Sequence, residues 1–298
     1  MFTPDQYELV DFGHGRRLER FGPIVLDRPC PVAEARHPAD PAAWRTAHAR
    51  FERSDGEEGQ WTVARPLPEP WVIAHESLRF ELRLTPFGQV GLFPEQAENW
   101  DWLSRQLKAA GSSVRLRVLN LFAYTGGSTL ATAACKKGTV PFLPPEVVHV
   151  DAAKNIVAWA RRNAELSGMA DLPIHWITED AQKFVKRELR RGNCYDVVIL
   201  DPPSYGHGPH GEVWRLSKHL PRLLAQCGEL TAGRLRSMLL CCHTPGFESE
   251  RLKEMMVGAL GGSGSGTITA KQLSIRSAAG RQLPSGVAVR WQTPAKNV

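Results

Sequence analysis

The chain contains few cysteines and no long hydrophobic run. Its six cysteines include no CxxC pair and show no regular spacing, which argues against a structural zinc site and a disulfide framework. No stretch approaches the roughly 18 apolar residues that a membrane-spanning helix needs, and the polar first residues do not resemble an export signal. Repeats of the solenoid type are also absent. We therefore expect a cytoplasmic protein without a metal and without membrane insertion.

The composition indicates a globular protein. Of the 298 residues, 42% are hydrophobic and 23% are charged, which allows one large core or two unequal cores and disfavours disorder. The formal net charge of +6 is compatible with a nucleic-acid partner, but many other enzymes carry a similar excess. Charge alone therefore leaves the partner open.

The first third of the chain differs in pattern from the rest. Residues 1–95 contain short apolar runs separated by Gly, Pro and Trp, which predicts a small β-rich domain. The alternating run at residues 80–85 is typical of a half-buried strand, and we interpret residues 41–53 as a helix that interrupts the strands. The second domain is expected to cover residues 96–298.

Helical and apolar segments alternate through the second domain. After a helical pattern at residues 95–110, the apolar runs predict strands at 117–121, 147–150, 174–177, 196–200 and 237–242. Helices are expected after each of the first four strands. The glycine-rich residues 261–266 are interpreted as a tight loop before a closing pair of strands at 267–273 and 287–291. This alternation is typical of a parallel α/β sheet.

The strand predicted at residues 196–200 runs directly into Asp201, Pro202 and Pro203, in the segment YDVVILDPPSYG. A buried strand that ends in an acid and two prolines is typical of a reaction site, because the prolines have a restricted φ and no backbone donor. An Asp-Pro surface turn is the simpler interpretation. The site is favoured because the three preceding strands also end in a glycine turn or an acid, at the edge where α/β sheets bind ligands.

These other strand ends indicate a nucleoside cofactor. The first leads into NLFAYTGGSTLATAA, where glycines admit a ligand and Ser128 and Thr129 are placed to cap a helix. This spacing differs from the GxGxxG of dinucleotide binders. Asp151 follows the second strand, where it could bind ribose hydroxyls, and Asp180 follows the third, where it could bind an adenine amine. Taken singly, either acid could simply cap a helix.

Four segments resemble class I S-adenosylmethionine-dependent methyltransferases, and more closely the bacterial family related to the C5-cytosine methyltransferases of large-subunit ribosomal RNA. They are FGQVGLFPEQAENWDW, NLFAYTGG, HVDAAKN and DPPSYGHG. The resemblance implies an α/β fold with a seven-stranded, Rossmann-like sheet of strand order 3-2-1-4-5-7-6 beside the small β-rich N-terminal domain. It also implies S-adenosylmethionine as cofactor and RNA, in particular ribosomal RNA, as substrate.

The resemblance also assigns roles to residues. It implies that the glycine turn holds the methionine end of the cofactor, and that Asp201 with the two prolines faces the transferred methyl. The implied cofactor-binding residues are Glu95, Gln96, Asn120, Phe122, Ala123, Tyr124, Thr125, Gly126, Gly127, Asp151, Ala152, Asp180, Ala181 and Asp201. The implied catalytic residues are Asp201, Pro202, Pro203 and Tyr205, and the Tyr205 ring could stack on a base.

One group expected from the resemblance is missing after the fifth strand. C5-cytosine relatives carry a cysteine there, because a thiolate must add to C6 of the pyrimidine. Thr244 stands at that position, and Cys242 is the only substitute, although cysteines in strands are usually core residues. A nitrogen or oxygen target therefore stays open, with His207, His210 and His243 as candidate bases.

Basic residues at 182–191, and Arg161 with Arg162, could contact RNA phosphates, although such runs are more often solvated helix faces. Four other functions stay open at this point. They are methyl transfer to a small molecule, methyl transfer to a protein, a non-catalytic RNA-binding role and, on a Rossmann sheet, a nicotinamide-dependent oxidoreductase.

Overall fold

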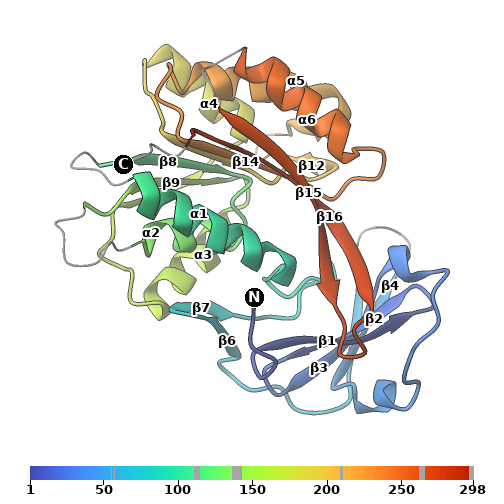
Figure 1. Ribbon diagram of the computed structural model, residues 1–298. Helices are drawn as coiled ribbons and strands as arrows, with labels where there is room; N and C mark the ends of the chain where they lie inside the picture. The colour runs from blue at the N-terminus through green and yellow to red at the C-terminus, as the bar shows by residue number, and fades with distance from the viewer. Residues whose placement is uncertain are drawn as a thin grey trace. The chain divides into compact units, whose positions relative to one another are not determined.

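The computed structural model describes residues 1–298 except for 55, 57, 111–114, 136–142, 209–210, 262–265 and 295–298. The chain forms two compact units, and its segments can be followed in Figure 1. The first unit comprises Met1–Ala97 and Ser274–Ser285, and the second comprises Glu98–Leu273 and Gly286–Val298. A stretch near the C-terminal end of the chain therefore belongs to the N-terminal unit.

The first unit is built on a five-stranded sheet with the order β1-β2-β3-β4-β5. Its strands are β1 (Tyr7–Gly13), β2 (Arg16–Phe21), β3 (Ile24–Pro29), β4 (Ala49–Arg53) and β5 (Gly59–Val63). A separate hairpin joins β6 (Val72–His75) to β7 (Leu78–Glu81), and the short 3-10 turns are η1 (Pro31–Ala33), η2 (Ala43–Thr46) and η3 (Pro94–Gln96). The strand predicted at residues 80–85 is β7, which begins and ends earlier.

The helix predicted at residues 41–53 is wrong. Only the short turn η2 is helical there, and the last five residues form β4. Within β4, Ala49 and Phe51 are each 1% exposed and alternate with the exposed Arg50 and Glu52. This period of two buries the apolar side chains on one face of the sheet, and pairing with β3 and β5 outweighs the helix propensity of alanine and arginine.

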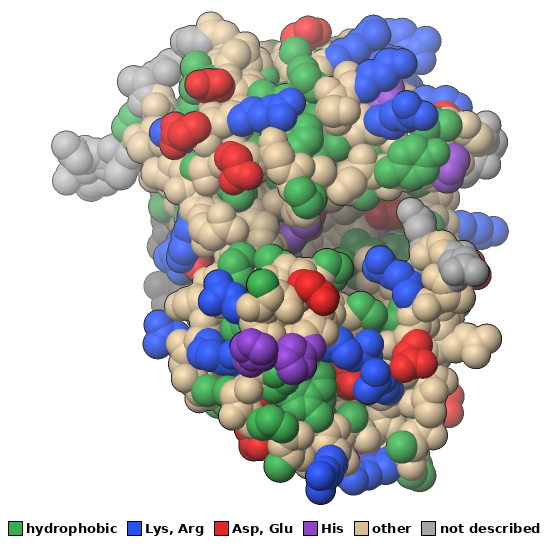
Figure 2. Space-filling model, turned by 90° about the vertical axis from the view of Figure 1, so that its right-hand side faces the viewer, with side chains coloured by type: hydrophobic (Ala, Val, Ile, Leu, Met, Phe, Trp, Pro, Cys, Tyr) green, Lys and Arg blue, Asp and Glu red, His purple; other side chains and the backbone are tan. Residues whose placement is uncertain are grey.

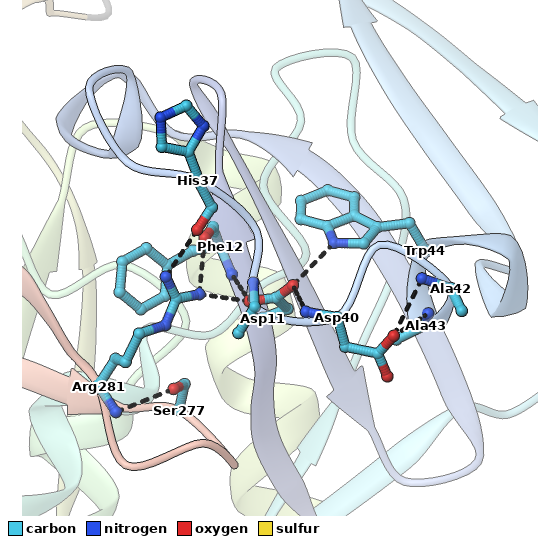
Figure 3. A network of polar contacts seen from close by, with 10 residues as sticks. Asp11, Phe12, His37, Asp40, Ala42, Ala43, Trp44, Ser277 and Arg281 are labelled. Atoms are coloured by element: carbon cyan, nitrogen blue, oxygen red, sulfur yellow. Dashed lines mark hydrogen bonds and ion pairs between the residues drawn. The ribbon is translucent and has the colours of Figure 1, made fainter.

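A network around Asp11 organises one end of the first unit (Figure 3). The buried Asp11 carboxylate accepts hydrogen bonds from the backbone of Ala39 and Asp40 and from Nε1 of Trp44, each at 3.0 Å. It also pairs with Nη2 of Arg281, whose Nη1 donates to the His37 carbonyl at 2.7 Å. Burial raises the pKa of Asp11, but these backbone and Trp44 hydrogen bonds outweigh it and lower the pKa below its ordinary value.

The second unit contains a seven-stranded sheet with the order β10-β9-β8-β11-β14-β16-β15. The strands are β8 (Arg117–Leu121), β9 (Glu146–Asp151), β10 (Ile174–Thr178), β11 (Val197–Leu200), β14 (Ser237–Cys242), β15 (Thr267–Arg276) and β16 (Gln282–Gln292). The first five are parallel, and β16 pairs antiparallel to β14. The predicted α/β fold class and the strand order 3-2-1-4-5-7-6 are therefore confirmed. Most of the glycine-rich loop predicted at 261–266 lies outside the described residues.

Helices cover both faces of this sheet (Figure 1). They are α1 (Ala97–Ala110), α2 (Gly127–Ala133), α3 (Lys154–Leu166), α4 (Ala181–Arg190), α5 (Leu216–Glu229) and α6 (Ser249–Leu260). Figure 1 shows α1, α2 and α3 on one face and α4, α5 and α6 on the other. The central strands are accordingly buried on both sides: Val198 and Leu200 pack in the core below α4 to α6, and Val197 and Ile199 in the opposite core.

Candidate active site

The polar residues predicted at four strand ends meet at one edge of the sheet. Strands β10, β9, β8 and β11 are parallel neighbours, so their carboxyl ends lie side by side. Asp180 lies two residues past β10, Asp151 ends β9, the turn at residues 122–127 follows β8, and Asp201 follows β11. This edge is where open α/β sheets bind ligands. We therefore treat it as the candidate site.

The turn after β8 has an unusual backbone. Phe122, Tyr124 and Gly126 all have left-handed conformations, with φ of 55°, 49° and 91°. For the two residues that carry side chains this costs about 1–3 kcal/mol each, so surrounding contacts must hold the turn. The backbone N–H of Ala123 donates to the Val150 carbonyl at 3.1 Å and is one such contact. Strain of this kind is typical of a backbone shaped to meet a ligand.

The two glycines of the turn leave no room for a side chain. A Cβ atom on Gly127 would lie 2.4 Å from Cζ2 of Trp100, and one on Gly126 would lie 3.2 Å from Cβ of Ala160. The predicted capping of α2 by Ser128 and Thr129 is wrong, because Gly126 is the N-cap and no side chain caps the helix. Both residues lie inside the first turn of α2, where their side chains sit beyond the capping position.

Asp151 ties the end of β9 to the glycine turn. Its Oδ2 accepts the backbone N–H of Tyr124 at 2.9 Å, and its Oδ1 accepts the backbone N–H of Ala153 at 3.0 Å. Burial raises the pKa of this carboxyl, although the backbone hydrogen bonds act in the opposite direction. Each carboxylate oxygen has a second lone pair that can accept a hydroxyl group. The neighbouring Ala152 is partly buried.

Asp180 does act as a helix cap. It is the N-cap of α4, and its Oδ1 accepts the backbone N–H of Lys183 at 2.9 Å. Its Oδ2 has no hydrogen-bond partner among the residues that the structure describes. The next residue, Ala181, is the first residue of α4 and is buried. Capping therefore occupies one oxygen and leaves the other for the predicted contact with an amine.

Asp201 lies next to a histidine from the following strand end. Its Oδ1 is 3.4 Å from Nε2 of His243, which follows β14. Pro202 is buried and Pro203 is exposed, and the Pro203 carbonyl accepts Nε1 of Trp214 at 2.7 Å. Of the three candidate bases, the structure therefore places His243 beside the acid. His207 lies further along the chain in β12 (Tyr205–His207), and His210 is outside the described residues.

Cys242 is unsuited to act as a nucleophile. Its side chain is buried in the core below α4 to α6, and burial raises the pKa of its thiol, which disfavours the thiolate. Thr244, which stands where C5-cytosine relatives are expected to carry their cysteine, places Oγ1 2.7 Å from Oγ of Ser204. Two hydroxyl groups thus join the turn after β11 to the residues after β14.

A buried polar chain supports the glycine turn from beneath and was missed in the sequence. The Asn120 amide donates to Oγ1 of Thr129 at 2.9 Å, and Nδ1 of His149 lies 2.9 Å from the same oxygen. Separately, the amide of the buried Asn163 donates to the Thr125 carbonyl at 3.0 Å. In the sequence, Asn120 and His149 are polar residues within largely apolar runs, and such residues are more often isolated in the core. Asn120, predicted to bind the cofactor, is buried and serves this network.

Two predicted residues belong to the other unit. Glu95 and Gln96 form part of η3, within the first unit, and their role toward the cofactor stays a prediction.

Within the described parts of the chain, no group of three metal-binding side chains is found. Likewise, none of the helices that the structure describes is long and apolar enough to cross a membrane.

The chemistry of the edge fits S-adenosylmethionine. Left-handed and glycine residues bring backbone close to a ligand, Asp151 and Asp180 each retain acceptor capacity, and a Cβ atom at Gly127 would collide with Trp100. Hydroxyl and amine donors of a nucleoside suit these acceptors. The individual cofactor contacts stay predictions.

The chain matches a known protein family over most of its length. Residues 40–254 match the family model described as S-adenosylmethionine-dependent methyltransferase. A crystal structure of the S-adenosylmethionine-dependent methyltransferase from Agrobacterium tumefaciens is 36% identical, with a TM-score of 0.88, over 97% of this chain and 91% of that one. This likeness includes both units.

Curated relatives match over shorter stretches. Ribosomal RNA large subunit methyltransferase I of Aeromonas salmonicida is 31% identical over 137 residues, which are 46% of this chain and 31% of the relative. The enzyme of the same name from Erwinia tasmaniensis is 28% identical over 220 residues, which are 67% of this chain and 52% of the relative. The chain thus spans about a third to a half of the length of these relatives.

Proposed function

Because the chain belongs to the family of S-adenosylmethionine-dependent methyltransferases, we propose that it transfers a methyl group to RNA, and specifically to ribosomal RNA. The protein is a methyltransferase with S-adenosylmethionine as its cofactor. The proposal for the substrate is supported by the curated relatives, which are named as ribosomal RNA large subunit methyltransferases. Such a substrate is consistent with the net charge of +6 and with a cytoplasmic location.

The cofactor supplies a methyl group on a positively charged sulfur, which makes the methyl carbon an electrophile. The residues that would hold it are the glycine turn at 122–127 and the carboxylates of Asp151 and Asp180. The turn is kept in its strained shape by β9 and by the Asn163 amide. Positioning of this kind is the main contribution that a protein makes to methyl transfer.

We infer that the target atom is a nitrogen or an oxygen. Attack by C5 of a pyrimidine needs a cysteine thiolate that adds to C6. The thiol of Cys242 is buried with a raised pKa, and Thr244 and Ser204 supply hydroxyl groups instead. A nitrogen or oxygen atom carries its own lone pair and needs no covalent link to the enzyme.

Asp201 and His243 form the pair that would act on this target. The Asp201 carboxylate can accept a hydrogen bond from an N–H or O–H group of the substrate and so orient its lone pair. His243 Nε2, 3.4 Å from that carboxylate, can receive the proton that the target loses, and the negative charge of Asp201 stabilises the resulting imidazolium. This contact between Asp201 and His243 is the observation that carries the proposed mechanism.

One experiment tests both the substrate and the target atom. Total RNA from a strain that lacks this protein is incubated with the enzyme and S-adenosylmethionine labelled in its methyl group, and nucleosides are then analysed by mass spectrometry. We expect the label in a single nucleoside, as an N-methyl or O-methyl group. Label in 5-methylcytidine would overturn the target atom, and no label in any nucleoside would overturn the RNA substrate.

A further inference from the structure

The two-stranded hairpin that follows Pro203 and Ser204 has two unlike faces. Strand β12 pairs with β13 (Val213–Arg215), so Tyr205 is opposite Arg215, and His207 is opposite Val213. Because side chains alternate along a strand and opposed residues share a face, these four side chains lie together. Trp214, which is opposite Gly206, points the other way.

The inward face holds the hairpin on the candidate site. Trp214 is 5% exposed, its Nε1 donates to the Pro203 carbonyl at 2.7 Å, and its ring lies 4.9 Å from that of Phe122 in the glycine turn. The Ser204 carbonyl also accepts the backbone N–H of Leu216 at 3.0 Å. The hairpin is therefore fixed to both the turn after Asp201 and the turn after β8.

The outward face leaves two apolar side chains partly exposed to water. Tyr205 is 44% exposed and Val213 is 43% exposed, and the rings of Tyr205 and His207 pack edge to face with centroids 5.1 Å apart. Arg215 is exposed on the same face and forms no ion pair with any described residue. An exposed aromatic side chain flanked by a cation is suited to stack on an unpaired base.

A basic groove lies between α4 and α5. It has a volume of about 550 Å³ and is lined by Glu179, Lys183, Lys186, Arg187, Leu189, Arg190 and Gln226. Arg187 pairs with Glu179 at 2.5 Å, whereas Lys186 and Arg190 form no ion pair with described residues. Figure 2 shows Lys and Arg side chains gathered at the top of the view, the level of α4 to α6 in Figure 1. Because Arg187 pairs with Glu179 and Lys183 pairs with Glu212, Lys186 and Arg190 carry the positive charge that favours an anion such as phosphate.

The groove and the hairpin are connected. Lys183 in the first turn of α4 forms an ion pair with Glu212, which precedes β13. We propose that single-stranded RNA binds along this surface, with an unpaired base next to the target stacked on Tyr205 and with backbone phosphates in the groove at Lys186 and Arg190. This inference rests on the proposed RNA substrate. Negative charge on every nucleotide and exposed base faces make single-stranded RNA the occupant that matches both parts.

Binding of RNA oligonucleotides tests the proposal. The probes are a single-stranded oligouridine of about 12 nucleotides and an RNA duplex of the same length, measured by fluorescence anisotropy over a range of salt concentrations. Tyr205→Ala is expected to weaken binding of the single strand about tenfold, and Tyr205→Phe, which keeps the ring, is expected to bind like the unmodified enzyme. For the double variant Lys186→Gln/Arg190→Gln, we expect a shallower salt dependence. The slope of the logarithm of the binding constant against the logarithm of the salt concentration should fall in magnitude by about 1.4.

The controls separate this proposal from that for the substrate. Arg65→Gln removes an exposed cation after β5, which is not among the residues that line the groove, and is expected to leave binding within twofold. If the unmodified enzyme methylates RNA but Tyr205→Ala and the groove variant bind normally, the surface is assigned wrongly. Equal or tighter binding of the duplex would also overturn it. If the unmodified enzyme neither binds nor methylates any RNA, the proposed substrate itself fails.

Discussion

Oγ of Ser204 lies 2.7 Å from Oγ1 of Thr244, so the turn after β11 and the residues after β14 are joined by two hydroxyl groups. Thr244 stands where C5-cytosine methyltransferases are expected to carry a catalytic cysteine. Cys242, the thiol two residues before it, is buried in the core below α4 to α6. The site therefore contains an acid, Asp201, beside a histidine that can accept a proton, His243. Burial raises the pKa of the Cys242 thiol and so disfavours its thiolate.

Replacing Cys242 by alanine is expected to leave methyl transfer within about twofold, because the thiol is buried and its raised pKa keeps it protonated. The substitution should lower the free energy of unfolding by about 1 kcal/mol through the cavity that it leaves. Turnover is measured with labelled S-adenosylmethionine, and stability by urea titration. Cys227→Ala, which removes another fully buried thiol in α5, is the matched control. Loss of turnover in Cys242→Ala alone, with the fold intact, would show that the thiol takes part.

Asp201→Asn is expected to reduce the rate of methyl transfer by about 100-fold or more while S-adenosylmethionine still binds within about threefold. The amide keeps the shape of the side chain but loses the charge that pairs with His243. Single-turnover rates and isothermal titration separate the two effects. Asp171→Asn, at an exposed acid in the loop before β10, serves as control. Equal loss of cofactor binding and rate would assign Asp201 to the cofactor instead of the reaction.

Asp151→Ala is expected to weaken S-adenosylmethionine binding about 10-fold to 100-fold, because the turn loses the acceptor for the Tyr124 N–H and the nucleoside loses its expected partner. Asp151→Asn keeps one acceptor oxygen and should bind with intermediate affinity. Isothermal titration with S-adenosylmethionine, and with NADH as a negative control, measures both variants. Unchanged affinity in the alanine variant would place the ribose elsewhere.

The buried His149 predicts a loss of stability in mild acid. Burial lowers its pKa from the ordinary 6.5 to about 3. As the pH falls below 6.5, the unfolded chain therefore binds a proton that the folded protein does not, and stability declines until about pH 3. Near pH 5 this amounts to about 2 kcal/mol.

Urea unfolding of the wild-type protein and of His149→Gln, near pH 7 and near pH 5, checks this prediction. The glutamine variant can still accept a hydrogen bond from Thr129, and it should lose about 2 kcal/mol less than the wild-type protein between the two pH values. His175→Gln, at an exposed histidine in β10, is the control and should follow the wild-type protein. Identical pH dependence in all three proteins would contradict the buried neutral state of His149.

Asp11→Ala is expected to destabilise the first unit by about 2–3 kcal/mol, because the backbone N–H groups of Ala39 and Asp40 and the partly exposed Arg281 guanidinium lose their acceptor. Since the pKa of Asp11 is lowered by folding, its contribution is present above pH 3.8 and is lost as the pH falls through the folded-state value. Urea unfolding followed by circular dichroism measures the change. The neighbouring Asp40→Ala, which removes two exposed hydrogen bonds to η2, should cost about 1 kcal/mol.

The nicotinamide-dependent oxidoreductase is wrong, because the chain belongs to the methyltransferase family. The boundary expected between residues 95 and 96 stays a prediction of domain organisation, although the contacts group Ser274–Ser285 with the first unit. Arg281, in that stretch, pairs with Asp11, and nothing in the local sequence around either residue indicates the partner.

The sequence by itself determined the sheet, its strand order through the family resemblance, and the four strand ends that carry Asp201, Asp180, Asp151 and the glycine turn. These features follow from local patterns, because buried parallel strands are continuous apolar runs and because their carboxyl ends must share one edge. Only the tertiary structure decided β4, the buried contact of Asn120 and His149 through Thr129, the pairing of Asp201 with His243, and the outward face of the hairpin at Tyr205. Each of these depends on burial or on contacts between separate segments, which residue pattern and spacing do not encode.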